Sequence, residues 1–371
     1  MEPHEQPINQ IPVQEANKKR ISILPPIIVL LIVIFSISAF FILSKLFNIS
    51  VASIPQVTLS KGNISPTPIP FVEMTIPYLR EKTFKNSLSS PTPISNNSNY
   101  QSFLTSYDSD GYKINALLTI PNVDMPLGGF PAIVFVHGYL DPTSYITNGS
   151  PYSSYVDFLA RNGFVVLKID LRGHGNSEGE PGGGYYGSDY ILDTLNAYAA
   201  LESFKTVNAS KIGLWGHSMA GNVLLRSFVI KPNIPAVNIW GGAVFTYTDR
   251  LKYGINDNSY RPPATANQTR RRRTELIEKY GDFKENSLFW SKVAPTNYLN
   301  DIKGALQLNH AIDDGTVSIG YSRDLVKLLS KTDVNFELKE YPSGGHDIEG
   351  SNFIVAMQNT VDFFNKYLKG E

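Results

Sequence analysis

The chain has 371 residues, enough for one large domain with accessory segments. Its 33 basic residues balance its 33 acidic residues, so no global field would recruit nucleic acid or an anionic membrane surface. Cysteine is absent, which excludes disulfides, a cysteine nucleophile and thiolate metal sites.

An apolar run near the N-terminus predicts one transmembrane helix. Residues 21–43 carry no charge, and a run of this length can cross a hydrocarbon core of about 30 Å. The basic residues 18–20 precede the run and only Lys45 follows closely, so residues 1–20 are expected in the cytoplasm and the rest outside the cell membrane. A cleaved signal peptide is the alternative, since Ser50-Val51-Ala52 is an acceptable cleavage site, but the apolar run is longer than signal peptides usually have.

The composition changes after the predicted span. Residues 44–97 are rich in Ser, Pro, Thr and Asn, which predicts an extended linker that holds a globular domain, residues 98–371, away from the membrane. Within the linker, only residues 71–78 are apolar enough to dock on a folded surface.

From residue 98 onward, short strands alternate with helices, which predicts an α/β domain with a mainly parallel sheet covered by helices. The runs 132–136 and 164–169 are apolar and β-branched, as expected of strands buried on both faces. The other predicted strands and helices are, in chain order, 113–119, 153–162, 191–201, 212–215, a helix from Met219 to Pro232, 306–308, 321–329, 335–341 and 353–364. A less regular insertion at about 242–295 predicts a cap over the domain.

The strongest local signal is Gly216-His217-Ser218-Met219-Ala220-Gly221, which follows the pattern G-x-S-x-G between a predicted strand and a predicted helix except that Ala220 stands at its last position and Gly221 follows. Such a turn strains the serine backbone and exposes its hydroxyl at the carboxyl edge of the sheet, while the glycines let strand and helix pack closely. The context predicts Ser218 as a nucleophile. A glycine-rich structural turn is the alternative.

A serine nucleophile needs an imidazole as general base and a carboxylate that orients the imidazole. Where a serine occupies such a turn, the chain order is Ser, then Asp or Glu, then His. Of the six histidines, only His310 and His346 follow the serine. His346 lies in the glycine-rich loop after the last predicted strand and is the predicted base, while His217 adjoins the serine and is expected to point away from it.

The orienting acid is expected on the loop after the preceding strand. Asp313 and Asp314 both lie there, and chain position alone does not choose between them. His310 precedes both on the same loop, so we interpret it as a structural residue and not as the base.

Acyl transfer also needs two backbone N–H donors aimed at the developing oxyanion. Met219, the residue after the serine, supplies the first. The sequence Phe135-Val136-His137-Gly138-Tyr139 follows a buried strand and has a glycine where the backbone must bend, so the N–H of Tyr139 is the predicted second donor. A plain glycine turn is the alternative.

Seven segments occur in order over about 270 residues: SYDSDGYKINALLTIPN, FVHGY, DLRGHGNS, LWGHSMAG, APTNYL, HAIDDGTV and YPSGGH. Together they resemble the alpha/beta hydrolases of the prolyl-oligopeptidase and dienelactone-hydrolase-like branch. The family pattern of His, Gly, two residues, Asp, two residues and Val implies that Asp314 is the acid. Ala311 stands where that pattern has glycine, and Ala220 replaces another common glycine.

The resemblance implies an alpha/beta-hydrolase fold with a cap insertion, and an acyl-enzyme that cleaves small acyl esters, thioesters or short peptides. The large peptidases of the family carry an N-terminal β-propeller, whereas a span and a linker precede the domain here, so oligopeptidase activity is not expected. A catalytically silent surface-binding protein is the alternative. The presence of all five predicted site residues favours the enzyme, because a silent protein has no chemical need for them.

The predicted cap contains the basic run Arg270–Arg273. This run could favour anionic or acyl substrates, but the interpretation we prefer is the solvated face of a cap helix. No Walker A, HExxH or Cys/His zinc pattern occurs, so neither a cofactor nor a metal is expected, and no nucleic-acid partner is expected either.

Overall fold

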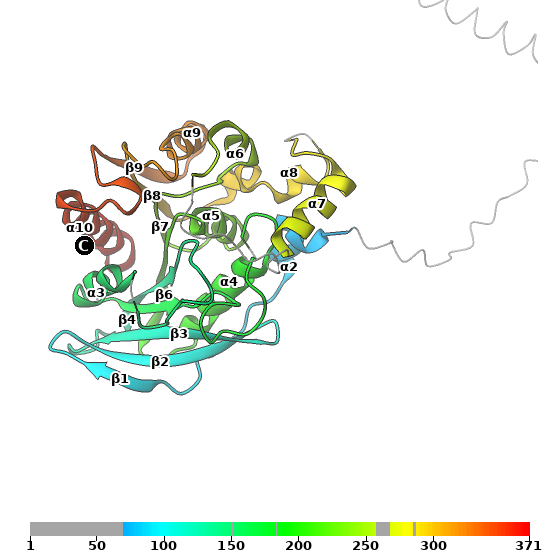
Figure 1. The fold of residues 1–371 in the computed structure, drawn as a ribbon. Helices are drawn as coiled ribbons and strands as arrows, with labels where there is room; N and C mark the ends of the chain where they lie inside the picture. Colours follow the sequence, from blue (N-terminus) through cyan, green and yellow to red (C-terminus); the bar gives the residue numbers. More distant parts are fainter. Residues whose placement is uncertain (1–69, 150, 183, 257–267, 285–286) are drawn as a thin grey trace, which may run out of the picture. The chain divides into compact units, whose positions relative to one another are not determined.

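One nine-stranded sheet organises the residues that the computed structural model describes, 70–149, 151–182, 184–256, 268–284 and 287–371 (Figure 1). The strand order is β1-β2-β3-β5-β4-β6-β7-β8-β9. The strands are β1 (Thr92–Asn96), β2 (Tyr100–Ser109), β3 (Tyr112–Pro121), β4 (Phe130–Val136), β5 (Val165–Ile169), β6 (Val207–His217), β7 (Ala236–Trp240), β8 (Ala305–Ala311) and β9 (Asn335–Tyr341). The first three strands pair antiparallel and β3 pairs antiparallel with β5, while the remaining pairs are parallel. The α/β prediction is confirmed.

Helices cover both faces of the sheet (Figure 1). The helices are α2 (Ile76–Glu81), α3 (Ser153–Arg161), α4 (Asp189–Glu202), α5 (Ala220–Ile230), α6 (Tyr247–Tyr253), α7 (Gln268–Tyr280), α8 (Trp290–Val293), α9 (Gly320–Leu329) and α10 (Ser351–Phe364). Short 3-10 turns η1 (Val72–Met74), η2 (Pro295–Asp301) and η3 (Gly345–Asp347) and a π-helical turn η4 (Asn365–Lys369) complete the elements. Because α4 and α5 pack on one face and α3 and α10 on the other, the inner strands are buried on both sides, as their apolar sequences require.

The predicted elements lie where the structure has them, but strands β2 and β7 were not predicted. Strand β7 shows why a buried strand can be missed. This strand, AVNIW, is only five residues long and carries Asn238 at its centre. Asn238 is fully buried, and its amide donates to the Gln307 side chain on neighbouring β8. The central asparagine, whose amide is hydrogen-bonded to the neighbouring strand, therefore breaks the apolar pattern by which a buried strand is recognised. The predicted cap corresponds to the stretch between β7 and β8, which contains α6, α7, α8 and η2.

The prediction of a linker over residues 44–97 is wrong in its second half. Helix α2 packs its apolar face into the core beside α5, where Ile76 and Leu79 are completely buried and Met74 nearly so. Strand β1 then extends the sheet beyond β2. The described part of the folded unit therefore includes η1 and α2, well before residue 98, because an apolar helical turn lies within the Ser/Pro-rich stretch.

The predicted span at 21–43 lies outside the described residues. Within the ranges that the structure describes, no helix is both long enough and apolar enough to cross a bilayer.

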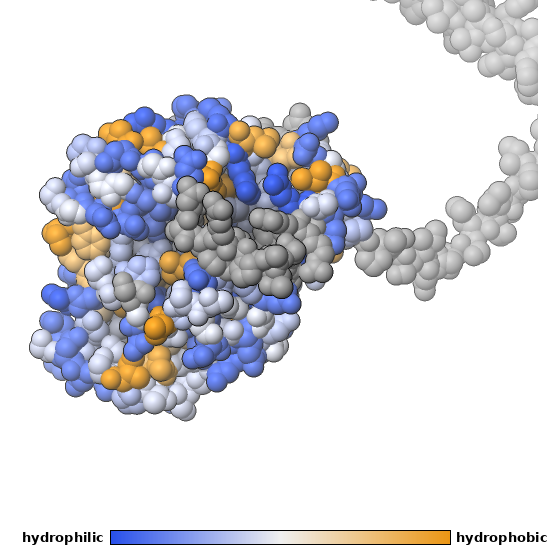
Figure 2. Space-filling view, in the orientation of Figure 1, coloured by the Kyte–Doolittle hydropathy of each residue, from blue (hydrophilic) through white to orange (hydrophobic). Residues whose placement is uncertain are grey.

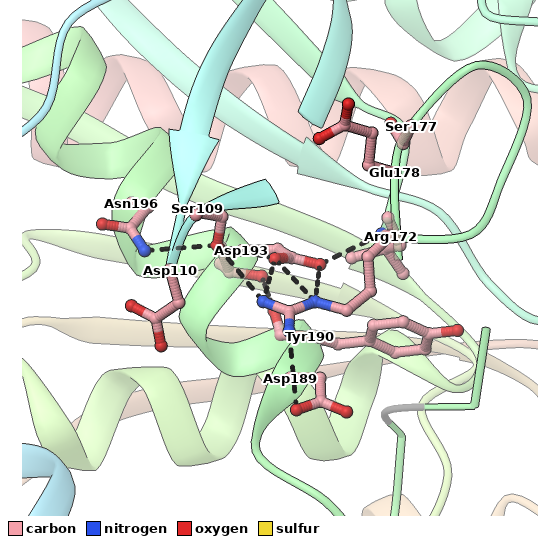
Figure 3. A network of polar contacts seen from close by, with 12 residues as sticks. Ser109, Asp110, Arg172, Ser177, Glu178, Asp189, Tyr190, Asp193 and Asn196 are labelled. Carbon is pink, nitrogen blue, oxygen red and sulfur yellow. Dashed lines mark hydrogen bonds and ion pairs between the residues drawn. The ribbon is translucent and has the colours of Figure 1, made fainter. Parts of the chain in front are cut away.

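A buried ion-pair network joins the loop after β5 to α4 (Figure 3), and an ion pair of Asp189 extends it to the cap. Arg172 donates from Nε and Nη2 to the carboxylate of Asp193, at 3.1 and 2.6 Å, and its backbone N–H donates to the same carboxylate. One turn earlier on α4, Asp189 lies 3.6 Å from Arg172 and 2.5 Å from Arg272 of α7. Burial alone would lower the pKa of Arg172, but the hydrogen bonds and charges of the aspartates raise it, so the cation persists. The cap helix is therefore tied to the core through Asp189.

The packing of α2 gives a first prediction. Leu79→Ala should lower the free energy of unfolding by about 3 kcal/mol, because it opens a cavity at a completely buried site. Tyr78→Ala, at the preceding and 38% exposed position, is the control and should cost less than about 1 kcal/mol. Denaturant unfolding of residues 70–371 measures both. Equal small effects would mean that α2 does not belong to the cooperative unit.

Candidate active site

The predicted nucleophile occupies the sharp turn between β6 and α5. Ser218 has a φ of 57°, a left-handed conformation that is strained for a residue with a side chain. A Cβ on Gly216 would lie 2.8 Å from Ala220 Cβ, and a Cβ on Gly221 would lie 2.8 Å from Gly242 Cα. Gly216 and Gly221 are thus required by close packing.

The predicted base and acid meet beside this turn. His346, in η3, lies with Nδ1 at 2.8 Å from Oδ2 of Asp314, on the loop after β8. A Cβ on Gly241 would lie 3.2 Å from His346 Nδ1, and Gly241 follows Trp240, whose carbonyl accepts the Ser218 N–H at 2.9 Å. Three segments far apart in sequence therefore converge at the carboxyl ends of β6, β8 and β9. Since Nδ1 donates to the carboxylate, a neutral His346 carries its lone pair on Nε2.

The carboxylate of Asp314 is fully buried and fully engaged. Its Oδ1 accepts the N–H groups of Thr316 and Val317, at 2.9 and 2.8 Å, and its Oδ2 lies 3.2 Å from Nε2 of His310 as well as beside His346. Burial alone would raise the pKa of Asp314, but the hydrogen bonds from His310 and His346 hold it well below its ordinary value. The acid therefore stays ionised throughout the neutral range. His310 positions it, which extends the structural role expected for that histidine.

The neighbouring Asp313 has a different task. Its exposed carboxylate accepts the N–H groups of Gly344 and Gly345, at 3.3 and 2.9 Å, and so holds the turn that carries His346. The two adjacent side chains point to different partners, and only Asp314 reaches the imidazole.

His217 has a role that the sequence pattern did not predict. This histidine is buried, its ring packs 4.5 Å from the ring of His346, and its Nε2 donates to the His346 carbonyl at 3.0 Å. Burial and the adjacent His346 lower the pKa of His217 to about 4, so it is neutral near pH 7 and its Nδ1 accepts the hydroxyl proton of Tyr152 at 2.8 Å. The Tyr152 oxygen in turn accepts the Gly138 N–H at 3.0 Å. Only the position next to the nucleophile signalled His217, and nothing in the sequence signalled Tyr152.

This chain of bonds bears on the predicted oxyanion donors. The Gly138 N–H is already committed to Tyr152, and a Cβ on Gly138 would lie 3.2 Å from Ser218 Cβ, so this loop passes directly over the nucleophile. Tyr139 follows it and is half-buried, and Met219 follows Ser218 at the entrance of α5. Both predicted donors therefore lie on segments that touch the serine.

Known proteins share this fold. A sequence model described as the alpha/beta hydrolase fold matches residues 131–235. Among solved structures, acetyl xylan esterase 1 from Thermoanaerobacterium sp. is 18% identical with a TM-score of 0.53, covering 78% of this chain and 90% of its own. Acylaminoacyl peptidase from Pyrococcus horikoshii is 18% identical with a TM-score of 0.56, covering 73% of this chain but 42% of its own.

A curated relative, the polyketide transferase claH of Penicillium crustosum, is 27% identical over 117 residues, which is 32% of this chain and 38% of that protein. The chain thus spans well under half of the curated relative that it matches. The strand order and the sequence model agree, and the chain has the alpha/beta hydrolase fold.

The contrast between the two aspartates gives a second prediction. Asp314→Asn should lower kcat by about 10⁴-fold with little change in melting temperature, since an amide favours the wrong tautomer of His346. Asp313→Asn keeps one acceptor oxygen and loses at most one exposed hydrogen bond of about 1 kcal/mol, so its loss should stay within about tenfold. Ester turnover and melting curves of both variants decide, and a deeper loss in the Asp313 variant would reverse the roles.

Proposed function

We propose that this protein is a membrane-anchored serine hydrolase that cleaves ester, thioester or small amide bonds through an acyl-enzyme. The observation that carries the proposal is the His346–Asp314 pair beside a serine held in left-handed conformation. A strained serine, an oriented imidazole and a buried carboxylate are the parts that such chemistry needs.

In the proposed reaction, His346 Nε2 takes the hydroxyl proton as Ser218 attacks the substrate carbonyl. Asp314 accepts the Nδ1–H and stabilises the imidazolium that forms, without taking the proton. The N–H groups of Met219 and Tyr139 receive the oxyanion. His346 then gives its proton to the departing alcohol, thiol or amine. Water repeats the sequence on the acyl-enzyme and releases the acid.

The names of the structurally similar proteins favour this chemistry over the alternative of a catalytically silent surface-binding protein. Their names describe esterases and peptidases, and the His346–Asp314 pair of this chain suits either bond type. Among the residues that the structure describes, no three His, Asp or Glu side chains are grouped as ligands for a metal ion. The alternative of a silent surface-binding protein predicts no covalent reaction at Ser218, which makes it directly testable.

The nucleophile gives a third prediction. The full chain, purified in detergent, should react with a fluorophosphonate probe and hydrolyse 4-nitrophenyl butyrate, and Ser218→Ala should abolish labelling and lower kcat on the order of 10⁶-fold. Ser210→Ala, an exposed serine on the same strand, is the control and should keep both activities. Labelling that persists in Ser218→Ala would place the nucleophile elsewhere, and no labelling of the native chain would favour the silent protein.

Membrane anchoring gives a fourth prediction, motivated by the uncharged run 21–43 and the basic residues 18–20 before it. Alkaline phosphatase fused to the C-terminus should be active in a bacterial host, whereas a reporter that fluoresces only in the cytoplasm should stay dark. The protein should also stay in the membrane fraction after a high-salt wash. A mature N-terminus at Ser53 would instead show cleavage as a signal peptide.

A further inference from the structure

A cavity of about 240 Å³ lies between the cap and the loop that precedes α4. Its walls are mainly aromatic and its charged groups come from α6, α7 and the turn after α7. The residues that matter for its chemistry are Tyr186, Tyr247, Arg250, Arg273, Asp282 and Trp290. On the face shown in Figure 2, strongly hydrophilic and apolar side chains lie side by side over α6 and α7.

Both loops that form this cavity also touch the nucleophile turn. On one side, the Ala243 N–H donates to the Ser218 carbonyl at 3.0 Å, and the chain reaches Tyr247 four residues later. On the other side, a Cβ on Gly184 would lie 3.3 Å from Met219 Sδ, and Tyr186 is two residues further. The Tyr247 hydroxyl donates to the Tyr185 carbonyl at 2.5 Å and joins the loops. At about 3.3 Å per residue, the four residues from Ala243 to Tyr247 span at most about 13 Å, so the cavity wall lies on segments that begin at the nucleophile turn.

The two arginines that line this cavity, Arg250 and Arg273, lie against an aromatic ring and not against a carboxylate. The Arg250 guanidinium lies 5.4 Å from the ring centre of Tyr186 and donates to its hydroxyl at 3.2 Å, and the Arg273 guanidinium lies 5.7 Å from the same ring. Neither forms an ion pair with any carboxylate in the described part of the chain, whereas their neighbour Arg272 is paired with Asp189. With Asp282 as the one acidic group on the wall, the cavity carries an excess positive charge.

We propose that this cavity binds the far end of an acyl group that terminates in a carboxylate, so that the preferred substrates are monoesters or monothioesters of dicarboxylic acids. Arginine pairs with carboxylates in a fork geometry, and the aromatic walls of Tyr247 and Trp290 suit the methylenes that lead to Ser218. The inference rests on the proposed acyl-enzyme at Ser218. Hydrolysis then releases a dicarboxylic acid and the alcohol or thiol, with water as the second reactant.

The substrate test gives a fifth prediction and uses the full chain in detergent. Mono-4-nitrophenyl esters of succinate, glutarate, adipate and suberate are compared with the same compounds whose free carboxyl is methylated. The ratio of kcat/KM, acid over methyl ester, should exceed about tenfold at the best chain length, as a charged hydrogen bond to arginine allows. It should fall as salt rises, because the added ions screen the attraction. A ratio at or below one for every length would overturn the proposal.

Matched variants assign this ratio to the cavity. Arg250→Gln and Arg273→Gln should each lower the ratio about tenfold, while Asp282→Asn should raise it. Lys279→Gln removes an exposed cation of α7 that does not line the cavity and should keep the native ratio. Arg273 is exposed, so its variant is expected to fold even if the half-buried Arg250 does not tolerate change. An identical drop in the Lys279 variant would mean that general surface charge, and not this cavity, sets the preference.

A binding measurement separates this inference from the proposed function. Monomethyl glutarate is titrated calorimetrically into Ser218→Ala and into the same protein carrying Arg273→Gln as well. Weaker binding in the double variant supports the proposed carboxylate site in the cavity, whether or not the native chain hydrolyses esters. A native chain that hydrolyses no ester would contradict the proposed function and not the binding site. Equal binding by both proteins, alongside normal butyrate turnover by the native chain, would overturn the inference and leave the hydrolase intact.

Discussion

The left-handed backbone of Ser218 is the constraint on which the rest of the site depends. A non-glycine residue in this conformation costs about 1–2 kcal/mol, so its surroundings must over-determine it. They do so from both sides, because Trp240 accepts the serine N–H while Ala243 and Gly221 donate to its carbonyl. The same contacts bring the loop after β7 against the nucleophile. The strain is therefore maintained by the very segments that form the site.

A continuous chain of hydrogen bonds, most of them made by histidines, connects the loops around this turn. The buried Asp314 gathers hydrogen bonds from His310 and His346, and the carbonyl of His346 accepts from His217. His217 continues through Tyr152 to the Gly138 N–H. The loop that approaches the oxyanion position and the loop that carries the base are thus fixed to one neutral imidazole, whose pKa of about 4 prevents it from charging near pH 7. A protonated His217 would lose its acceptor for Tyr152.

The sequence predicted the fold and the residues of the candidate site where chemistry imposes a local pattern. Ser218 was recognisable because its turn between a strand and a helix needs glycines close to the serine. Strand β9 was recognisable because polar segments bound its sequence on both sides. The role of Tyr152 could not be read, because its partners lie 14 and 65 residues away and only the fold brings them together. The same holds for α2, whose burial depends on a groove formed by later helices.

The N-terminal segment supports the site through one buried arginine. Arg226 lies on α5, eight residues after the nucleophile, and is completely buried. It donates to the carbonyls of Met74 and Gly187, both at 2.7 Å, and no carboxylate of the described residues neutralises it. Burial lowers its pKa, yet the carbonyls accept its protons and arginine keeps its charge in proteins. Without the segment around Met74, this cation would lose a partner inside the core, so the chain between the predicted span and the sheet also holds α5 and the loop at Gly187 together.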